Sequence, residues 1–148
     1  MSNFTAGGYA GDISATQTYA ALEQDTAAVL VDVRTVAEWS YVGVPDLSPL
    51  GRQALFVEWQ RFPDGARNPG FVDEVCALLE RHGATKENAI YFLCRSGVRS
   101  QGAATALTQA GFSQCFNVLA GFEGPLDESA HRATLAGWKQ EGLPWRQS

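Results

Sequence analysis

The sequence is poor in the residues that cross-link small domains or bind metals. Its 148 residues include three cysteines and two histidines. Cys76, Cys94 and Cys115 form no C-x-x-C pair, and His82 and His131 do not complete a spacing typical of metal ligands. We therefore expect no structural disulfide, no metal and no cofactor. Such sparse, odd-numbered cysteines favour a reducing compartment, here the cytoplasm.

Long apolar runs and an excess of basic charge are also absent. No run approaches the ~20 apolar residues that a membrane-spanning helix needs, and residues 1–5 lack the pattern of a signal peptide. Eleven basic against 16 acidic residues give a net charge of −5, which argues against nucleic acid or an anionic membrane as partner. The 45% hydrophobic content suits one globular domain over residues 1–148.

Apolar segments alternate with segments of helical period along the chain. Strands are predicted within 28–33, 54–59, 89–93 and 116–119. Helices are predicted within 18–24, 35–41, 68–82, 101–110 and 127–141, the first preceded by a capping box that starts at Ser14. Residues 1–11 are rich in glycine and are expected to be flexible or loosely packed. The alternation predicts an α/β fold with a mostly parallel sheet and helices on both faces.

One cysteine lies where a predicted strand ends and a predicted helix begins. Cys94 opens the stretch Cys94-Arg95-Ser96-Gly97-Val98-Arg99-Ser100. The free N–H groups and the dipole of a helix N-terminus favour an anion there, including a thiolate.

The composition of this loop supports an anion site. Gly97 permits the backbone angles with which successive N–H groups converge on one point. Arg95 and Arg99 add permanent positive charge, with Arg99 placed to hold anionic oxygens and Arg95 directed to solvent. A buried structural cysteine is the alternative, but it leaves the glycine and both arginines unexplained.

Several neighbours of the loop admit more than one role. Ser96 and Ser100 can donate to the anion or cap the helix, and capping is favoured for Ser100. Asp32 ends a strand on the same sheet edge as Cys94, so the two side chains can share a cleft. There Asp32 braces the loop or acts as a base. Arg34 reaches that cleft or pairs with Glu38.

Other side chains also have two readings. Trp59 and Phe62 line a pocket or pack in the core. Cys76 falls on the apolar face of its helix and is expected in the core, whereas Cys115 is a weak candidate for a resolving thiol.

Three motifs in order resemble the rhodanese family of sulfurtransferases. The Cys94 loop resembles the active-site loop of that family. The stretch 30–39 matches the early Asp-x-Arg…Glu-aromatic signature, and 118–124, with Trp138 and 142–144, matches the C-terminal pattern. The resemblance implies a single domain with a central parallel sheet of about five strands. It also implies that Cys94 accepts the sulfur atom and that residues 95–99 form its cradle.

The resemblance implies a sulfurtransferase activity, and two alternative functions stay open. It implies transfer of a sulfane sulfur from thiosulfate or polysulfide, through a Cys94 persulfide, to a thiol, cyanide or protein acceptor. A sulfur-carrier or redox-sensing module is one alternative. A phosphatase or arsenate reductase is another, but related dual-specificity phosphatases have a loop one residue longer than the six residues from Cys94 to Arg99. The segment 44–69 is a longer insertion without the family's usual histidine, which leaves substrate choice open.

Overall fold

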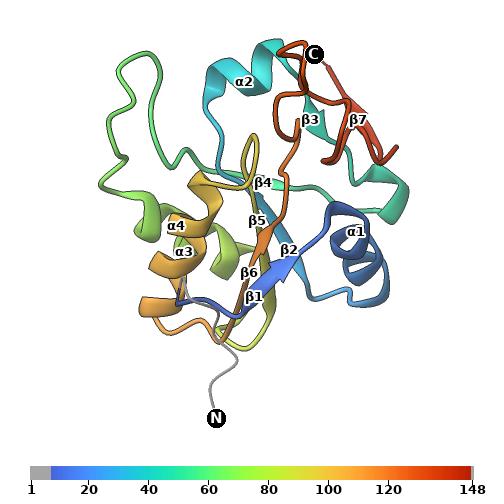
Figure 1. Cartoon of the computed structure of the whole chain (residues 1–148). Coiled ribbons are helices and arrows are strands. Elements are labelled where there is room, and N and C mark those ends of the chain that lie inside the picture. Colours follow the sequence, from blue (N-terminus) through green and yellow to red (C-terminus); the bar gives the residue numbers. More distant parts are fainter. Residues whose placement is uncertain (1–7, 148) are drawn as a thin grey trace.

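A five-stranded parallel sheet forms the centre of the computed structural model, which describes residues 8–147 (Figure 1). The strands follow the order β1-β6-β5-β2-β4 across the sheet. Their bounds are Gly11–Ile13 for β1, Val29–Asp32 for β2, Leu55–Phe56 for β4, Ala89–Leu93 for β5 and Gln114–Val118 for β6. A small antiparallel pair joins β3 (Val44–Pro45) to β7 (Trp145–Arg146). The predicted α/β class and parallel sheet are confirmed.

Helices cover both faces of the sheet. Figure 1 shows α3 and α4 on one side and α1 on the other. The helices are α1 (Ala15–Gln24), α2 (Val36–Tyr41), α3 (Phe71–Arg81) and α4 (Arg99–Gln109), with a short 3-10 helix at Ser48–Leu50. Both α1 and α2 begin with a capping box, in which Ser14 pairs with Gln17 and Thr35 with Glu38.

The central strand β5 divides the core in two. All five of its side chains are buried. Ile90 and Phe92 belong to the cluster beneath α3 and α4, whereas Tyr91 and Leu93 belong to the cluster that includes Leu22 of α1. A strand buried on both faces explains the uninterrupted apolar run in this part of the sequence.

The N-terminal segment is more ordered than its composition suggests. Residues 1–7 of the segment predicted to be loose lie outside the described residues. Tyr9, however, is 2% exposed and packs in the core, and Gly11 pairs with Phe116 in the sheet. Loose packing is therefore wrong for Tyr9 and Gly11, because β1 covers what would otherwise be an open edge of β6.

The predicted helix at 127–141 does not form. These residues make successive bends and turns, with positive φ at Ala130 and Ala133. The Asp127 carboxylate accepts N–H groups from Ser129 and His131, which satisfies backbone donors without a helix. Local side-chain bonds thus replaced the helical ladder that the sequence pattern predicted.

The insertion carries β3, the 3-10 helix, β4 and a long loop. The loop projects from the sheet in Figure 1 and is closed by a bridge between Gln60 and Arg67. The strand predicted at 54–59 shortens to the two residues of β4. Within residues 8–147, no helix has the length and hydropathy of a membrane span, and no cluster of His, Cys, Asp and Glu is suited to hold a metal.

Candidate active site

Cys94 follows directly on β5 and opens the loop that leads into α4. Its side chain is almost fully buried, and the Gly97 N–H donates to Cys94 Sγ at 3.1 Å. Gly97 has φ +100°, and a Cβ atom there would lie 3.2 Å from the Ala120 nitrogen. Glycine is therefore required for the backbone to turn its N–H toward the sulfur.

Ser100 contacts the sulfur instead of capping α4. Its Oγ lies 3.1 Å from Cys94 Sγ and donates to Asn117 Oδ1 on β6. The N-cap of α4 is Val98, which makes no side-chain capping bond. The capping role predicted for Ser100 is wrong, because the helix begins earlier and turns this side chain inward. Asn117 is fully buried and was missed, although an asparagine inside an apolar strand is itself a signal.

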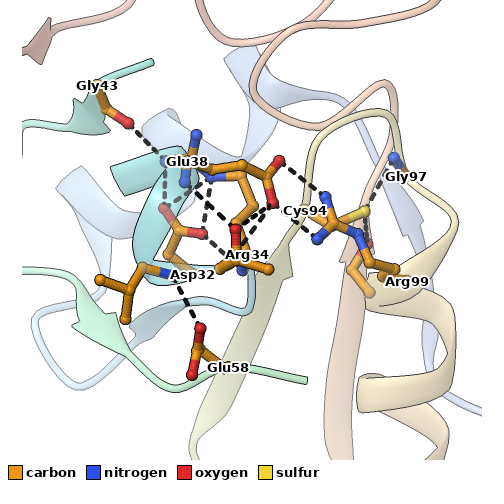
Figure 2. Close-up of polar contacts among 11 residues, drawn as sticks. Asp32, Arg34, Glu38, Gly43, Glu58, Cys94, Gly97 and Arg99 are labelled. Atoms are coloured by element: carbon orange, nitrogen blue, oxygen red, sulfur yellow. Dashed lines mark hydrogen bonds and ion pairs between the residues drawn. The ribbon is translucent and has the colours of Figure 1, made fainter. Parts of the chain in front are cut away.

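Arg99 does not point freely at the loop. Its two terminal nitrogens donate to the Glu38 carboxylate at 2.8 and 2.9 Å, across 61 residues of sequence. Figure 2 shows this fork beside Cys94. The guanidinium that the sequence predicts to hold a bound anion is instead paired with a carboxylate of the protein itself.

The Glu38 carboxylate is held from two directions. It accepts from Arg99 on α4 and from the backbone N–H and hydroxyl of Thr35 at the start of α2. Burial by itself would raise the pKa of Glu38, but the hydrogen bonds and charge of Arg99, with the Thr35 bond, hold that pKa below its ordinary value. Burial by itself would lower the pKa of Arg99, but the Glu38 carboxylate and the nearby Cys94 raise that pKa above its ordinary value. The pair stays ionised near neutral pH.

A cleft of about 800 Å³ opens over Cys94 and is lined by several arginines. Arg61, Arg95, Arg99 and Arg132 contribute positive charge, and Glu123 adds negative charge beside Glu38 in the lining. This surplus of positive groups contrasts with the net charge of −5 for the whole chain. The cleft is therefore suited to anions.

Apolar side chains complete the cleft. Phe62 and Val98 line it and are 69% and 71% exposed. Arg95 is exposed, as predicted, and Ser96 is half-buried in the lining. Trp59 does not line the cleft, because its ring packs against Phe71 with centroids 4.9 Å apart. Of the two aromatic side chains considered for the pocket, only Phe62 reaches it.

Asp32 and Arg34 lie outside the cleft. Both side chains are fully buried, with Arg34 Nη2 at 2.7 Å from Asp32 Oδ2. The same nitrogen donates to the Gly43 carbonyl, and the guanidinium lies over the Phe122 ring at 4.2 Å. Arg34 thus pairs with Asp32 and not with Glu38 (Figure 2). The prediction that these two side chains reach the cleft is wrong. Of the two roles considered for Asp32, the ion pair with Arg34 fits a structural brace and not a base.

The two other cysteines make no disulfide. Cys115 lies in β6 and is fully buried, and this burial raises the pKa of its thiol to about 11. A thiol that ionises so reluctantly is a poor resolving thiol. Cys76 is half-buried on α3 and packs against the core cluster, and burial raises its pKa as well.

Comparisons with known proteins agree with this architecture. The family described as STR4 middle domain matches residues 10–148. The chain belongs to this rhodanese-like family. It is 49% identical to Rv0390 from M. tuberculosis, whose crystal structure superposes with a TM-score of 0.84 and covers 95% of this chain and 99% of that one.

Two curated relatives extend the comparison. The Rickettsia rickettsii protein named "Uncharacterized protein RP600 homolog" is 38% identical over 136 residues, 91% of this chain and 96% of the relative. Rhodanese-like domain-containing protein 4, chloroplastic, of Arabidopsis thaliana is 26% identical over 132 residues, 89% of this chain and 25% of the relative. This rhodanese-like domain therefore occurs as a separate chain and within a longer protein.

Proposed function

We propose that this rhodanese-like domain is a sulfurtransferase that carries a sulfane sulfur on Cys94. The observation that carries the proposal is the position of Cys94 in the lining of an arginine-rich cleft, with the Gly97 N–H directed at its sulfur. A nucleophile with an N–H donor at its sulfur and permanent cations around it suits an anionic sulfur donor. The loop from Cys94 to Arg99 has six residues. A loop of this length suits a persulfide sulfur, which needs less space than a phosphoryl group.

The reaction consists of two displacements at sulfur. The Cys94 thiolate attacks the outer sulfur of thiosulfate, the S–S bond of the donor breaks, and sulfite leaves with the bonding electron pair. A polysulfide donor reacts in the same way and leaves as a shorter polysulfide. A thiolate or cyanide acceptor then attacks the terminal sulfur of the persulfide, and Cys94 leaves as thiolate. Such covalent catalysis gives ping-pong kinetics.

The arginines supply capture of the donor. Arg95 is exposed at the cleft and attracts anions from solution. Arg99 binds the anionic donor when that donor displaces the Glu38 carboxylate from the guanidinium. Two oxygens of thiosulfate can accept from the guanidinium in the same way as the two carboxylate oxygens of Glu38. Glu38 is thus a competitor of the donor in this proposal, and it holds Arg99 in position while the cleft is empty of donor.

A second candidate is a carrier that delivers the sulfur to a protein thiol. The exposed apolar side chains of Phe62 and Val98 beside the cleft favour it, because thiosulfate has no apolar surface to cover. Slow turnover with cyanide or small thiols, together with efficient transfer to a protein thiol, distinguishes the carrier. Both candidates use free thiols, for which we propose a reducing compartment.

The test is the intact mass of the purified protein after treatment with thiosulfate or polysulfide. We expect one added sulfur atom, removable by cyanide, in the wild type and in the Cys76→Ser control. We expect no addition in Cys94→Ser. Addition to Cys94→Ser, or no addition to the wild type with either donor, would contradict the proposed function.

A further inference from the structure

The sulfur of Cys94 lies at one end of a chain of hydrogen bonds that runs through the interior to β1. Ser100 Oγ is 3.1 Å from the sulfur and is bonded to Asn117 Oδ1. The amide nitrogen of Asn117 contacts Asp12 Oδ1 at 3.0 Å and the Gly97 carbonyl at 3.3 Å. Ser100 and Asn117 are fully buried, so each polar atom there must find its partner within the protein.

The partners of Asn117 fix which way its amide points. A backbone carbonyl and an ionised carboxylate only accept hydrogen bonds. The group that faces Gly97 O and Asp12 Oδ1 must therefore be the NH₂ group of Asn117. The amide oxygen then faces Ser100, and rotating the amide by 180° would set oxygen against oxygen at both other contacts.

The orientation of Asn117 in turn fixes the hydroxyl of Ser100. A serine hydroxyl has one hydrogen to donate, and here it goes to Asn117 Oδ1. Ser100 then presents only lone pairs to the sulfur at 3.1 Å. A thiol satisfies this contact by donating its S–H to Ser100, whereas a thiolate would meet the lone pairs of the oxygen.

We infer that Asn117 is a positioning residue which, held by Asp12 and Gly97, directs the Ser100 hydroxyl hydrogen away from the Cys94 sulfur. To form the thiolate, the S–H proton passes to a buffer base or water in the cleft. The Ser100 hydroxyl then turns from Asn117 to the sulfur and leaves Asn117 Oδ1 without its donor. The Gly97 N–H favours the thiolate, so Ser100 is the contact at which the two forms differ most.

Other charged groups also face the sulfur or line its cleft. They are Glu38, Arg61, Arg95, Arg99, Glu123 and Arg132, and Asp12 lies beyond Asn117. These groups stay the same when Asn117 or Ser100 is replaced. A difference between such variants therefore reports the hydrogen-bond chain and not the charge around it.

The test is the pH profile of alkylation of Cys94 by iodoacetamide in the full chain, read from the mass of the peptide that contains Cys94. In Asn117→Leu the Ser100 hydroxyl loses its acceptor and is free to donate to the thiolate. We expect the midpoint of the profile to fall by about one pH unit, which is a roughly tenfold faster reaction below the midpoint.

The matched control repeats the change in a Ser100→Ala background. There we expect Asn117→Leu to leave the midpoint where Ser100→Ala puts it, because the hydroxyl that transmits the effect is gone. An unchanged or higher midpoint in Asn117→Leu overturns the inference. So does an equal fall in both backgrounds, which would indicate a general change of packing.

A second variant covers the case in which Asn117→Leu does not fold. Asp12 is exposed, so Asp12→Ala removes one of the two acceptors that orient the amide without emptying a core position. The change also removes the acceptor of the Tyr9 hydroxyl, which the Ser100→Ala background shares. We expect a smaller fall of the midpoint that also disappears with Ser100→Ala, and a fall that persists there overturns the inference. Alkylation needs no sulfur donor, so these results stand whether or not Cys94 accepts sulfur.

Discussion

Two arginine–carboxylate pairs lie near the carboxyl ends of the central strands, and they differ in burial and in sequence separation. Asp32 and Arg34 are two residues apart, with side chains 0% exposed. Glu38 and Arg99 are 61 residues apart, with side chains 19% and 20% exposed. The first pair is closed off from solvent, whereas the second ties α2 to α4 at the wall of the cleft.

The difference separates a structural pair from an exchangeable one. Water cannot replace either partner of Asp32 and Arg34, and the guanidinium also contacts the Gly43 carbonyl and the Phe122 ring. Removing one partner leaves a buried charge unpaired. Water and anions reach Glu38 and Arg99, so loss of that pair costs little and an incoming anion can take its place.

The largest effect is expected from breaking the buried pair. Arg34→Met removes the charge that compensates Asp32 and should lower the free energy of unfolding by about 3–5 kcal/mol. Urea unfolding followed by circular dichroism measures it. The matched control is the double variant Asp32→Leu with Arg34→Met, which leaves no unpaired charge and should recover most of the loss. A loss below about 1 kcal/mol in Arg34→Met would mean that solvent reaches the pair.

A smaller effect, on donor binding, is expected from the half-buried pair of Glu38 and Arg99. Arg99→Ala should weaken capture of thiosulfate by about 1–3 kcal/mol, the range for charge-assisted hydrogen bonds, and so raise its KM. Glu38→Gln should lower KM, because the competing carboxylate loses its charge. Initial rates at varied thiosulfate measure both.

Arg95→Ala is the control for this pair of variants, since it removes one exposed cation from the same cleft and should change KM less than Arg99→Ala does. Unchanged saturation by the donor in Arg99→Ala would sink the role of Arg99 in donor capture. The ion pair of Arg99 with Glu38 would then serve only to hold α2 against α4.

The smallest effect is the pH dependence that Glu38 gives to stability. Its pKa is lower in the folded than in the unfolded chain, so its contribution is complete above the unfolded value of about 4.3 and is lost as pH falls through the folded value. We expect the wild type to be more stable than Glu38→Gln by about 1 kcal/mol at pH 7. Urea unfolding across pH should show that gap closing below about pH 4. A gap that widens on acidification would reverse the assigned sign.

Local patterns predicted much of the fold. The apolar run of β5, the capping box at Ser14 and the glycine in the Cys94 loop all depend on residues within one or two turns of one another. The exception at 127–141 shows the limit, because the side chain of Asp127 competed with a helix for the same backbone donors.

The site was predictable in its nucleophile and not in its contacts. Cys94 and Gly97 follow from a strand-to-helix junction that the sequence displays. Which carboxylate binds which arginine depends on how α2, α4 and β2 pack. The spacing of Asp32, Arg34, Glu38 and Arg99 does not contain that choice. Asn117 escaped notice because its partners come from β1, α4 and the Cys94 loop.

The sequence by itself determined most of the alternation of strands and helices, the junction that holds Cys94 and the two arginines of its loop, because these are set by residues near one another in the chain. Only the tertiary structure decided that Arg34 is buried against Asp32, that Glu38 occupies Arg99 and that Asn117 directs the Ser100 hydroxyl. The physical reason is that hydrogen bonds and ion pairs act over about 3 Å. Their partners are chosen by the packing that brings distant segments to that distance.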